Sequence, residues 1–304
     1  MKLSKQVNGL IGQLALHVVK ICDLGNICKS VYLVNDSSGR LMILKVGVDE
    51  TSCQEIYMNM VGYSRLLRLG LCDFIPEIYA CCLTGKETYI LMEYCGLDFF
   101  SMIQNVEEPL KCYTGLCELL LSLYTKSLQN DRSADNQLVN VWGTIRQQYN
   151  LYISSFDDYG EILKLLDSVD LKLKNIEVNK SCFSNWDFTP EDVYLNNGVF
   201  KYTDPHEDIL GIPILDLACF AGVARDAHFL PSAIEGYAVM KEFAIQSVGQ
   251  LFDMDEEISR AIFYLGRVLQ SFLSARFRMK VDKEQAALIV AQSKVYLVKV
   301  SDLL

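Results

Sequence analysis

Residues 184–204, SNWDFTPEDVYLNNGVFKYTD, carry the strongest functional signal in this chain. Asp187 is followed five positions later by Asp192, and Asp204 comes seventeen positions after Asp187. A proline turn and two short strand-like pieces separate these acids. One carboxylate in such a layout can accept the proton of an attacking hydroxyl, and the others can hold Mg²⁺, which prefers oxygen ligands. The alternative interpretation is three unrelated aspartates in turns, where Asp is common.

The first third of the chain has the pattern of an antiparallel sheet with one long helix. Short runs of alternating or β-branched apolar residues are separated by turn signals, whereas residues 50–69 have helical spacing, with Ile56, Met60 and Leu67 on one face. We expect a short helix at 3–15 and five strands within 15–24, 28–36, 40–47, 76–84 and 87–95.

The remainder of the chain is predominantly helical. Helical spacing predicts helices over 110–129, 136–153 and 159–175, and three more helical segments fit after residue 232. We therefore expect two lobes that meet at a hinge near 93–97, with a nucleotide-binding lobe at 1–95 and a helical lobe at 96–304 that carries the catalytic loop, the metal site and the acceptor pocket.

Composition excludes several classes of protein. Of the 304 residues 51% are hydrophobic and 22% charged, which rules out a disordered chain. The net charge of −10 makes a nucleic-acid partner unexpected, because phosphate neutralisation needs Lys and Arg. We find no apolar run long enough for a membrane span and expect no signal peptide. The eleven cysteines have no metal-type spacing, so free thiols in the cytoplasm are expected.

A lysine in an apolar strand suggests a second part of the site. Lys45 lies in LMILKVG and could clamp nucleotide phosphates, although an edge lysine that extends its ammonium into solvent is the alternative. Glu55 in the following helix is a candidate ion-pair partner for Lys45, and Glu50 is its rival.

Seven segments, in order, resemble the protein-kinase-like phosphotransferases, specifically the aminoglycoside phosphotransferase and choline kinase branch. LGNICKSVYLV resembles a nucleotide loop whose only glycine is Gly25, and ILKVG the lysine strand. GLCDFIPEIYA and YILMEYCGLDFF are similar to the following strands and the hinge. NWDFTPEDVYL resembles the catalytic loop, FKYTDP the metal aspartate, and GIPILDLACFA the helix start Gly-x-Pro-x-x-Asp-Leu-Ala.

This resemblance implies an α+β, bilobal kinase-like fold and an ATP- and Mg²⁺-dependent kinase that phosphorylates a hydroxyl of a small molecule. Asp187 would be the catalytic aspartate, Asp204 and Asp192 the metal ligands, and Asp216 a brace under the catalytic loop. The implied nucleotide contacts are Lys45 with Glu55 on the phosphates, the backbone of Glu93 and Cys95 on adenine, Met92 at the back of the pocket and Asp98 on the ribose.

Two departures from the family pattern keep alternatives open. Asn185-Trp186 stands where the family usually has His-Gly, and Asp192 replaces the usual asparagine. A nucleotide-binding pseudokinase and an atypical protein kinase therefore stay as alternatives, although no long peptide-docking segment follows Asp204. Residues 96–231 contain ten basic and twenty acidic residues, which favours a cationic acceptor such as an amino alcohol or an aminoglycoside-like compound. An ordinary acidic surface would explain the excess equally well.

Overall fold

The computed structural model describes residues 5–22, 30–84, 87–130, 133–184, 188–196, 198–205, 210–228 and 231–304. The chain forms two compact units. The first contains the described residues of Met1–Phe99 and Asp192–Glu207, and the second those of Phe100–Glu191 and Asp208–Leu304. The described residues of 192–207, which we expected in the helical lobe, are thus grouped with the first unit.

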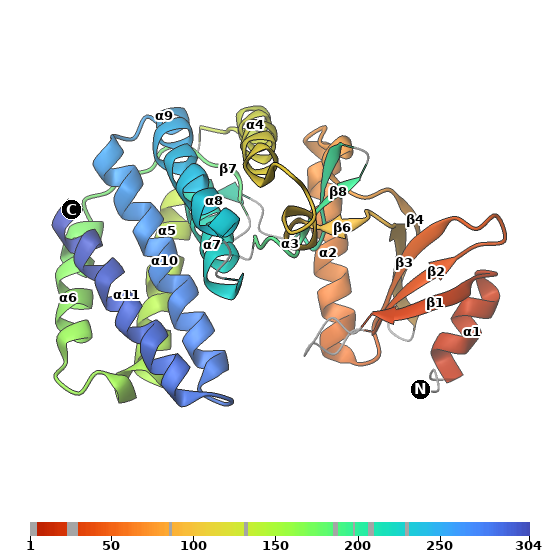
Figure 1. The fold of residues 1–304 in the computed structure, drawn as a ribbon, viewed down its shortest axis with the longest axis horizontal. Coiled ribbons are helices and arrows are strands. Elements are labelled where there is room, and N and C mark those ends of the chain that lie inside the picture. The colour runs from red at the N-terminus through yellow and green to blue at the C-terminus, as the bar shows by residue number, and fades with distance from the viewer. Residues whose placement is uncertain are drawn as a thin grey trace. The chain divides into compact units, whose positions relative to one another are not determined.

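The first unit is built on the expected five-stranded antiparallel sheet, whose strand order is β1-β2-β3-β5-β4 (Figure 1). The helix α1 (Lys5–Gln13) precedes the sheet, and α2 (Glu50–Arg68) connects β3 to the later strands. The strands are β1 (His17–Cys22), β2 (Ser30–Asn35), β3 (Leu41–Val46), β4 (Ile78–Thr84) and β5 (Glu87–Glu93).

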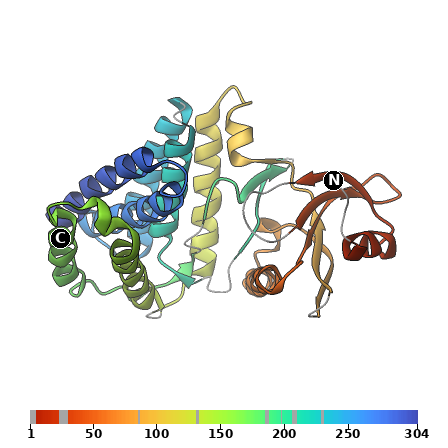
Figure 2. The ribbon, with the colours of Figure 1, turned by 90° about the horizontal axis from the view of Figure 1, so that it is seen from below.

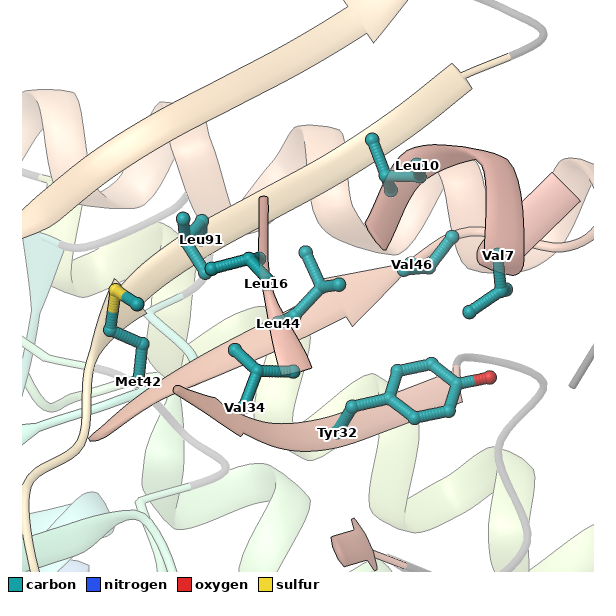
Figure 3. Close-up of a cluster of buried hydrophobic side chains, with 9 residues drawn as sticks. All are labelled: Val7, Leu10, Leu16, Tyr32, Val34, Met42, Leu44, Val46 and Leu91. Atoms are coloured by element: carbon teal, nitrogen blue, oxygen red, sulfur yellow. The ribbon is translucent and has the colours of Figure 1, made fainter. Parts of the chain in front are cut away.

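Side-chain alternation along the strands gives the sheet two different faces. On one face Val7 and Leu10 of α1 pack against Leu44 and Val46 of β3, together with five other buried residues (Figure 3). On the opposite face Ile56 of α2 packs on β5, so that the two helices lie on opposite sides of the sheet (Figure 2). Leu44 and Val46 point to the face that α1 covers. Because successive side chains of a strand point to opposite faces, Lys45 between them points to the face that α2 covers.

The buried side of α2 agrees with the expected one at Ile56 and Met60 but not at Leu67. Leu67 is 51% exposed, while Ile56, Asn59, Tyr63 and Leu66 are buried. The expected face followed the most apolar residues, but the protein turns two polar side chains inward, and they bond to a later part of the chain. The helix starts with a capping box in which Asp49 accepts from the Ser52 amide at 2.8 Å and the Ser52 hydroxyl accepts from the Asp49 amide at 3.0 Å.

A small three-stranded sheet completes the first unit. Its strands are β6 (Leu97–Asp98), β8 (Val193–Asn196) and β9 (Val199–Tyr202), with β8 in the middle. The short helix η1 (Cys72–Phe74) packs against β9, where the Phe74 and Tyr202 rings stack at 5.9 Å between centroids. The hairpin that carries the predicted metal aspartates is thereby fixed to the first unit.

The second unit is mainly helical, as expected. Two short strands, β7 (Cys182–Phe183) and β10 (Leu210–Gly211), pair within it. Its long helices α10 and α11 lie side by side (Figures 1 and 2). The helices are α3 (Phe99–Ile103, which begins at the end of the first unit), α4 (Pro109–Ser127), α5 (Ser133–Gln148), η2 (Tyr149–Ile153), η3 (Ser154–Phe156), α6 (Glu161–Leu173), α7 (Pro213–His228), α8 (Pro231–Glu242), η4 (Phe243–Val248), α9 (Gly249–Leu251), α10 (Glu256–Arg278) and α11 (Lys283–Leu303).

Within the described part of the chain, no helix has both the length and the apolar character that crossing a membrane requires.

A fully buried arginine organises the packing of α7, α8, α10 and α11. The Arg267 guanidinium lies over the rings of Tyr296 and Tyr237, at 5.2 and 5.9 Å from their centroids, and donates to Gln270 Oε1 at 2.8 Å. Its Nη1 occupies the space beside Gly222, where an added Cβ would lie only 1.0 Å away. Position 222 is therefore a glycine because the arginine side chain needs its volume.

We expect Gly222→Ala to lower the free energy of unfolding by about 1–3 kcal/mol, the usual cost of overpacking a core. This loss should occur although alanine is the better helix former by about 1 kcal/mol. Gly143→Ala in α5 is the matched control, because open space surrounds Gly143, and it should leave stability unchanged or raise it. Urea unfolding followed by circular dichroism measures both variants, and equal stability of the two would contradict this account.

Candidate functional site

The centre of the candidate site is an ion pair between Lys45 and Asp204, in which the lysine ammonium donates a hydrogen bond to the carboxylate. Lys45 is held in the middle of β3 by pairing with Val31 on one side and Ile90 on the other, and it is only 4% exposed. A buried ammonium needs a partner of opposite charge, because desolvation of a lone charge is expensive. The strand thus aims Lys45 at a carboxylate 159 positions further along the chain.

Asp204 follows β9 in an unusual backbone conformation. Its φ of +61° lies in the left-handed region that residues other than glycine rarely adopt. Its amide donates to the Tyr63 hydroxyl at 3.3 Å, and its carbonyl accepts from the Tyr202 hydroxyl at 3.4 Å. Burial, and next the charge of Asp204, raise the pKa of Tyr63 well above its usual value, so this phenol stays neutral.

Asp192 and Asp98 lie near Asp204 around one tyrosine. Tyr194 of β8 is the cross-strand partner of Asp98 in β6. Burial raises the pKa of the Tyr194 phenol, and the carboxylates of Asp192, Asp98 and Asp204 raise it further. The charges of the three predicted acids thus act on one side chain within the first unit.

These acids could supply some of the ligands of a Mg²⁺ ion, but not all of them. Among the residues described, no group of three or more His, Cys, Asp or Glu side chains is close enough to hold a metal alone. Mg²⁺ typically uses one or two protein carboxylates and takes its other ligands from phosphates and water. Asp192 and Asp204 fit that donor set, because both supply hard carboxylate oxygens.

The predicted hinge is tied to β9. The Glu93 carboxylate accepts from the Glu77 amide at 3.1 Å and lies 3.8 Å from the Lys201 ammonium, which also donates to the Ile75 carbonyl at 3.0 Å. Burial raises the pKa of the Cys95 thiol to about 12, so it is an inert apolar group at neutral pH.

The predicted partner of Lys45 on α2 remains a prediction. Glu55 is half-buried beside Ile56, which packs on Ile90, the cross-strand neighbour of Lys45. Glu50, the rival, is exposed at the first residue of the helix. Burial therefore favours Glu55 over Glu50, while the ion pair that the structure shows for Lys45 is the one with Asp204.

In the second unit, polar side chains fix the chain just before the predicted catalytic loop. Ser127 of α4 accepts from the Phe183 amide at 3.0 Å, and Gln137 of α5 donates to the Ser184 hydroxyl at 2.9 Å. The Gln137 carbonyl oxygen also accepts a hydrogen bond from the Ile212 amide, next to the start of α7. Gln137 thus joins two chain segments that are far apart in sequence.

Asp216 is buried in the first turn of α7, and its surroundings suit a bracing role. Burial, followed by the charge of Asp216, raises the pKa of the Tyr124 phenol and of the Cys182 thiol. The carboxylate therefore lies close to β7, which leads into the predicted catalytic loop.

Three elements of the sequence interpretation lie outside the described residues. These are Asp187, the Asn185-Trp186 pair before it, and Gly25 of the nucleotide loop.

Several site residues were not foreseen, namely Asn59, Tyr63, Ser127, Gln137, Lys201 and Tyr202. For Asn59 and Tyr63 a signal existed, because the i, i+4 spacing places two polar groups together on one helix face. Ser127 and Gln137 gave no such signal, since single polar residues in amphipathic helices are common on the exposed side.

Comparisons with known proteins support the fold. No protein-family model matches the chain, and no curated protein matches its sequence. Among solved structures, choline kinase LicA from Streptococcus pneumoniae is 14% identical, with 96% of this chain and 98% of that chain covered and a TM-score of 0.56. A choline/ethanolamine kinase family protein from Mesorhizobium loti is 12% identical, covers 98% and 99%, and has a TM-score of 0.60. The ADP-bound aminoglycoside phosphotransferase APH(2'')-Ib is 13% identical, covers 99% and 98%, and has a TM-score of 0.58.

The expected fold is confirmed by these similarities over nearly the whole length of both partners. The chain has the protein-kinase-like fold of the aminoglycoside phosphotransferase and choline kinase branch.

We expect Gln137→Leu to lower the free energy of unfolding by about 1–3 kcal/mol, because it leaves the buried Ile212 amide without its acceptor. Gln147→Leu on the exposed side of the same helix is the control and should change stability by less than about 0.5 kcal/mol. Urea unfolding of both variants tests this expectation. A Gln137→Leu protein as stable as the control would show that the bridge contributes nothing.

Proposed function

We propose that this protein is a phosphotransferase that moves the terminal phosphate of ATP to a hydroxyl of a small molecule. The observation that carries the proposal is the buried Lys45 paired with Asp204 beside Asp192 and Asp98. Phosphoryl transfer requires a positive charge on the phosphates and carboxylates that hold the metal ion, and a lysine next to acidic residues can supply both. Similarly folded proteins contain ADP, AMP or ATP, and they include kinases of small molecules.

In this proposal the first unit binds the nucleotide. Lys45 would contact the phosphates and Glu55 would orient it, while the backbone at Glu93 and Cys95 would recognise adenine. Met92, buried on the α2 face of β5, would close the back of the pocket. Asp98 would accept a hydrogen bond from the ribose. This assignment is supported by the fact that all of these residues belong to the first unit. Met92, Glu93, Cys95 and Asp98 lie close together in sequence, from the end of β5 to β6.

Asp204 and Asp192 would hold Mg²⁺ between the phosphates. When bound, Mg²⁺ neutralises the charge that develops on the transferred group. The phosphates and the metal would bind at the Lys45–Asp204 ion pair. Lys45 could exchange the Asp204 carboxylate for a phosphate, and Asp204 could exchange the Lys45 ammonium for Mg²⁺. Asp192 carries one more negative charge than the family's asparagine, and an aspartate is an equally suitable oxygen ligand.

Asp187 would position the acceptor hydroxyl and take its proton, with Asp216 bracing the loop from below. We infer that the acceptor is a small alcohol, with a cationic amino alcohol or aminoglycoside-like compound favoured. The charge of the chain supports this class, because the whole excess of acidic residues lies within 96–231. A cytoplasmic location is part of the proposal and rests on the cysteine content.

The test is acceptor-dependent ADP release with Mg²⁺ across cationic, neutral and anionic alcohols and a folded protein substrate. We expect turnover with cationic alcohols that weakens at high salt, because screening reduces attraction to an acidic site. Asp187→Asn should lower kcat by about 10²–10⁴, the scale of general base catalysis, with nucleotide affinity nearly unchanged. Phosphorylation of protein alone would favour the protein-kinase alternative, and nucleotide binding without any turnover the pseudokinase alternative.

The two metal aspartates should respond differently to substitution. Asp204→Ala should abolish Mg²⁺-dependent turnover, because it removes the main metal ligand and leaves the buried Lys45 without its carboxylate. Asp192→Asn restores the residue usual in the family, so activity should survive or rise. Steady-state turnover against Mg²⁺ concentration measures both effects. An active Asp204→Ala enzyme would remove this residue from the metal site.

A further inference from the structure

Three hydrogen bonds from buried side chains hold the backbone at Asp204. The Asp204 amide donates to Tyr63 and its carbonyl accepts from Tyr202, as described above. One residue further on, the Pro205 carbonyl accepts from Asn59 Nδ2 at 3.4 Å. The backbone of Asp204 and of the residue that follows it is therefore held by side chains of α2 and β9.

Something must offset the cost of the conformation at position 204. A left-handed backbone costs a residue with a Cβ roughly 1–2 kcal/mol, although Asp tolerates it better than most. Such strain persists only where the surroundings impose it. The surroundings here are the two tyrosine hydroxyls, which bond to the two polar backbone groups of the strained residue itself.

The positions of the two tyrosines suit this task. Tyr63 and Tyr202 are both fully buried, so their hydroxyls are available to protein groups rather than to solvent. The Tyr63 hydroxyl also donates to the Met92 thioether at 3.8 Å. Tyr63 therefore connects β5, at the predicted back of the nucleotide pocket, with the aspartate predicted to hold the metal.

We propose that Tyr63 and Tyr202 are positioning residues for Asp204. Their hydroxyls hold residue 204 in the left-handed conformation that directs its carboxylate to the position facing Lys45. They thereby set the affinity for a metal-loaded nucleotide, without touching either the metal or the nucleotide. This inference rests on the proposed function, because it takes Asp204 to be a metal ligand.

Phenylalanine substitutions isolate the hydroxyls. Tyr63→Phe and Tyr202→Phe keep the ring volume, and in Tyr202→Phe the stack on Phe74 is retained. Tyr57→Phe is the matched control, because Tyr57 lies on the same helix as Tyr63 but is 48% exposed. Urea unfolding of each variant confirms that it is folded before binding is measured.

The measurement is calorimetric binding of ADP in excess MgCl₂ and in EDTA, with the Mg²⁺ dependence of turnover as a second readout. For Tyr63→Phe and Tyr202→Phe we expect the Kd for ADP with Mg²⁺ to rise about 2–10-fold, the scale of one lost hydrogen bond. The Kd in EDTA should change less than twofold. The Mg²⁺ concentration for half-maximal turnover should rise in parallel, and Tyr57→Phe should match the wild type in all three.

Two results would overturn the inference alone. One is a Kd for ADP with Mg²⁺ that equals the wild-type value in both tyrosine variants. The other is an equal loss of affinity with and without Mg²⁺, which would make the tyrosines supports of the pocket in general. A wild-type protein that binds ADP in neither condition would instead overturn the proposed function, and this inference with it, so the two failures are distinguishable.

Discussion

The ion pair between Lys45 and Asp204 is the constraint on which the rest of the first unit depends. An ammonium in the centre of a sheet can be buried only with a carboxylate beside it, and removal of either partner leaves an uncompensated charge. The carboxylate comes from the end of β9, so the β8–β9 hairpin must pack on the same unit as β3. The inward-facing polar residues of α2, Asn59 and Tyr63, complete the attachment.

The same constraint explains why α2 is not a simple amphipathic helix. Its buried side combines Ile56 and Leu66, which pack apolar surface, with two polar groups that bond to the backbone around Asp204. An apolar helix face would cover the sheet equally well but would leave the hairpin carbonyl and amide groups without partners, which costs free energy when they are buried. The helix thus serves both the core and the candidate site.

The sequence predicted the secondary structure of the first unit well, because strand alternation and helical periodicity are local signals. It failed at Leu67, where the most apolar residues did not define the buried face. The resemblance implied that Lys45 and Asp204 both belong to the site, but it gave Glu55 as the partner of Lys45. The ion pair with Asp204 was not predicted, since 159 positions separate the two residues. The left-handed backbone at Asp204 could not be predicted, because no glycine or asparagine stands there. The Gln137 bridge was equally hidden, since both of its partners lie far away in sequence.

The grouping of residues 192–207 with the first unit has a consequence for biosynthesis. Lys45 and the strands around it leave the ribosome long before Asp204 does, so the nascent sheet must wait for its buried counter-charge until the first of the two segments of the helical unit has also been made. During that interval Lys45 lacks the carboxylate of Asp204, and burial of its ammonium without a partner would cost free energy. A fragment that ends after β5 would also lack Asp204. The first unit is made of two chain segments, so it can fold completely only after the second segment has been synthesised.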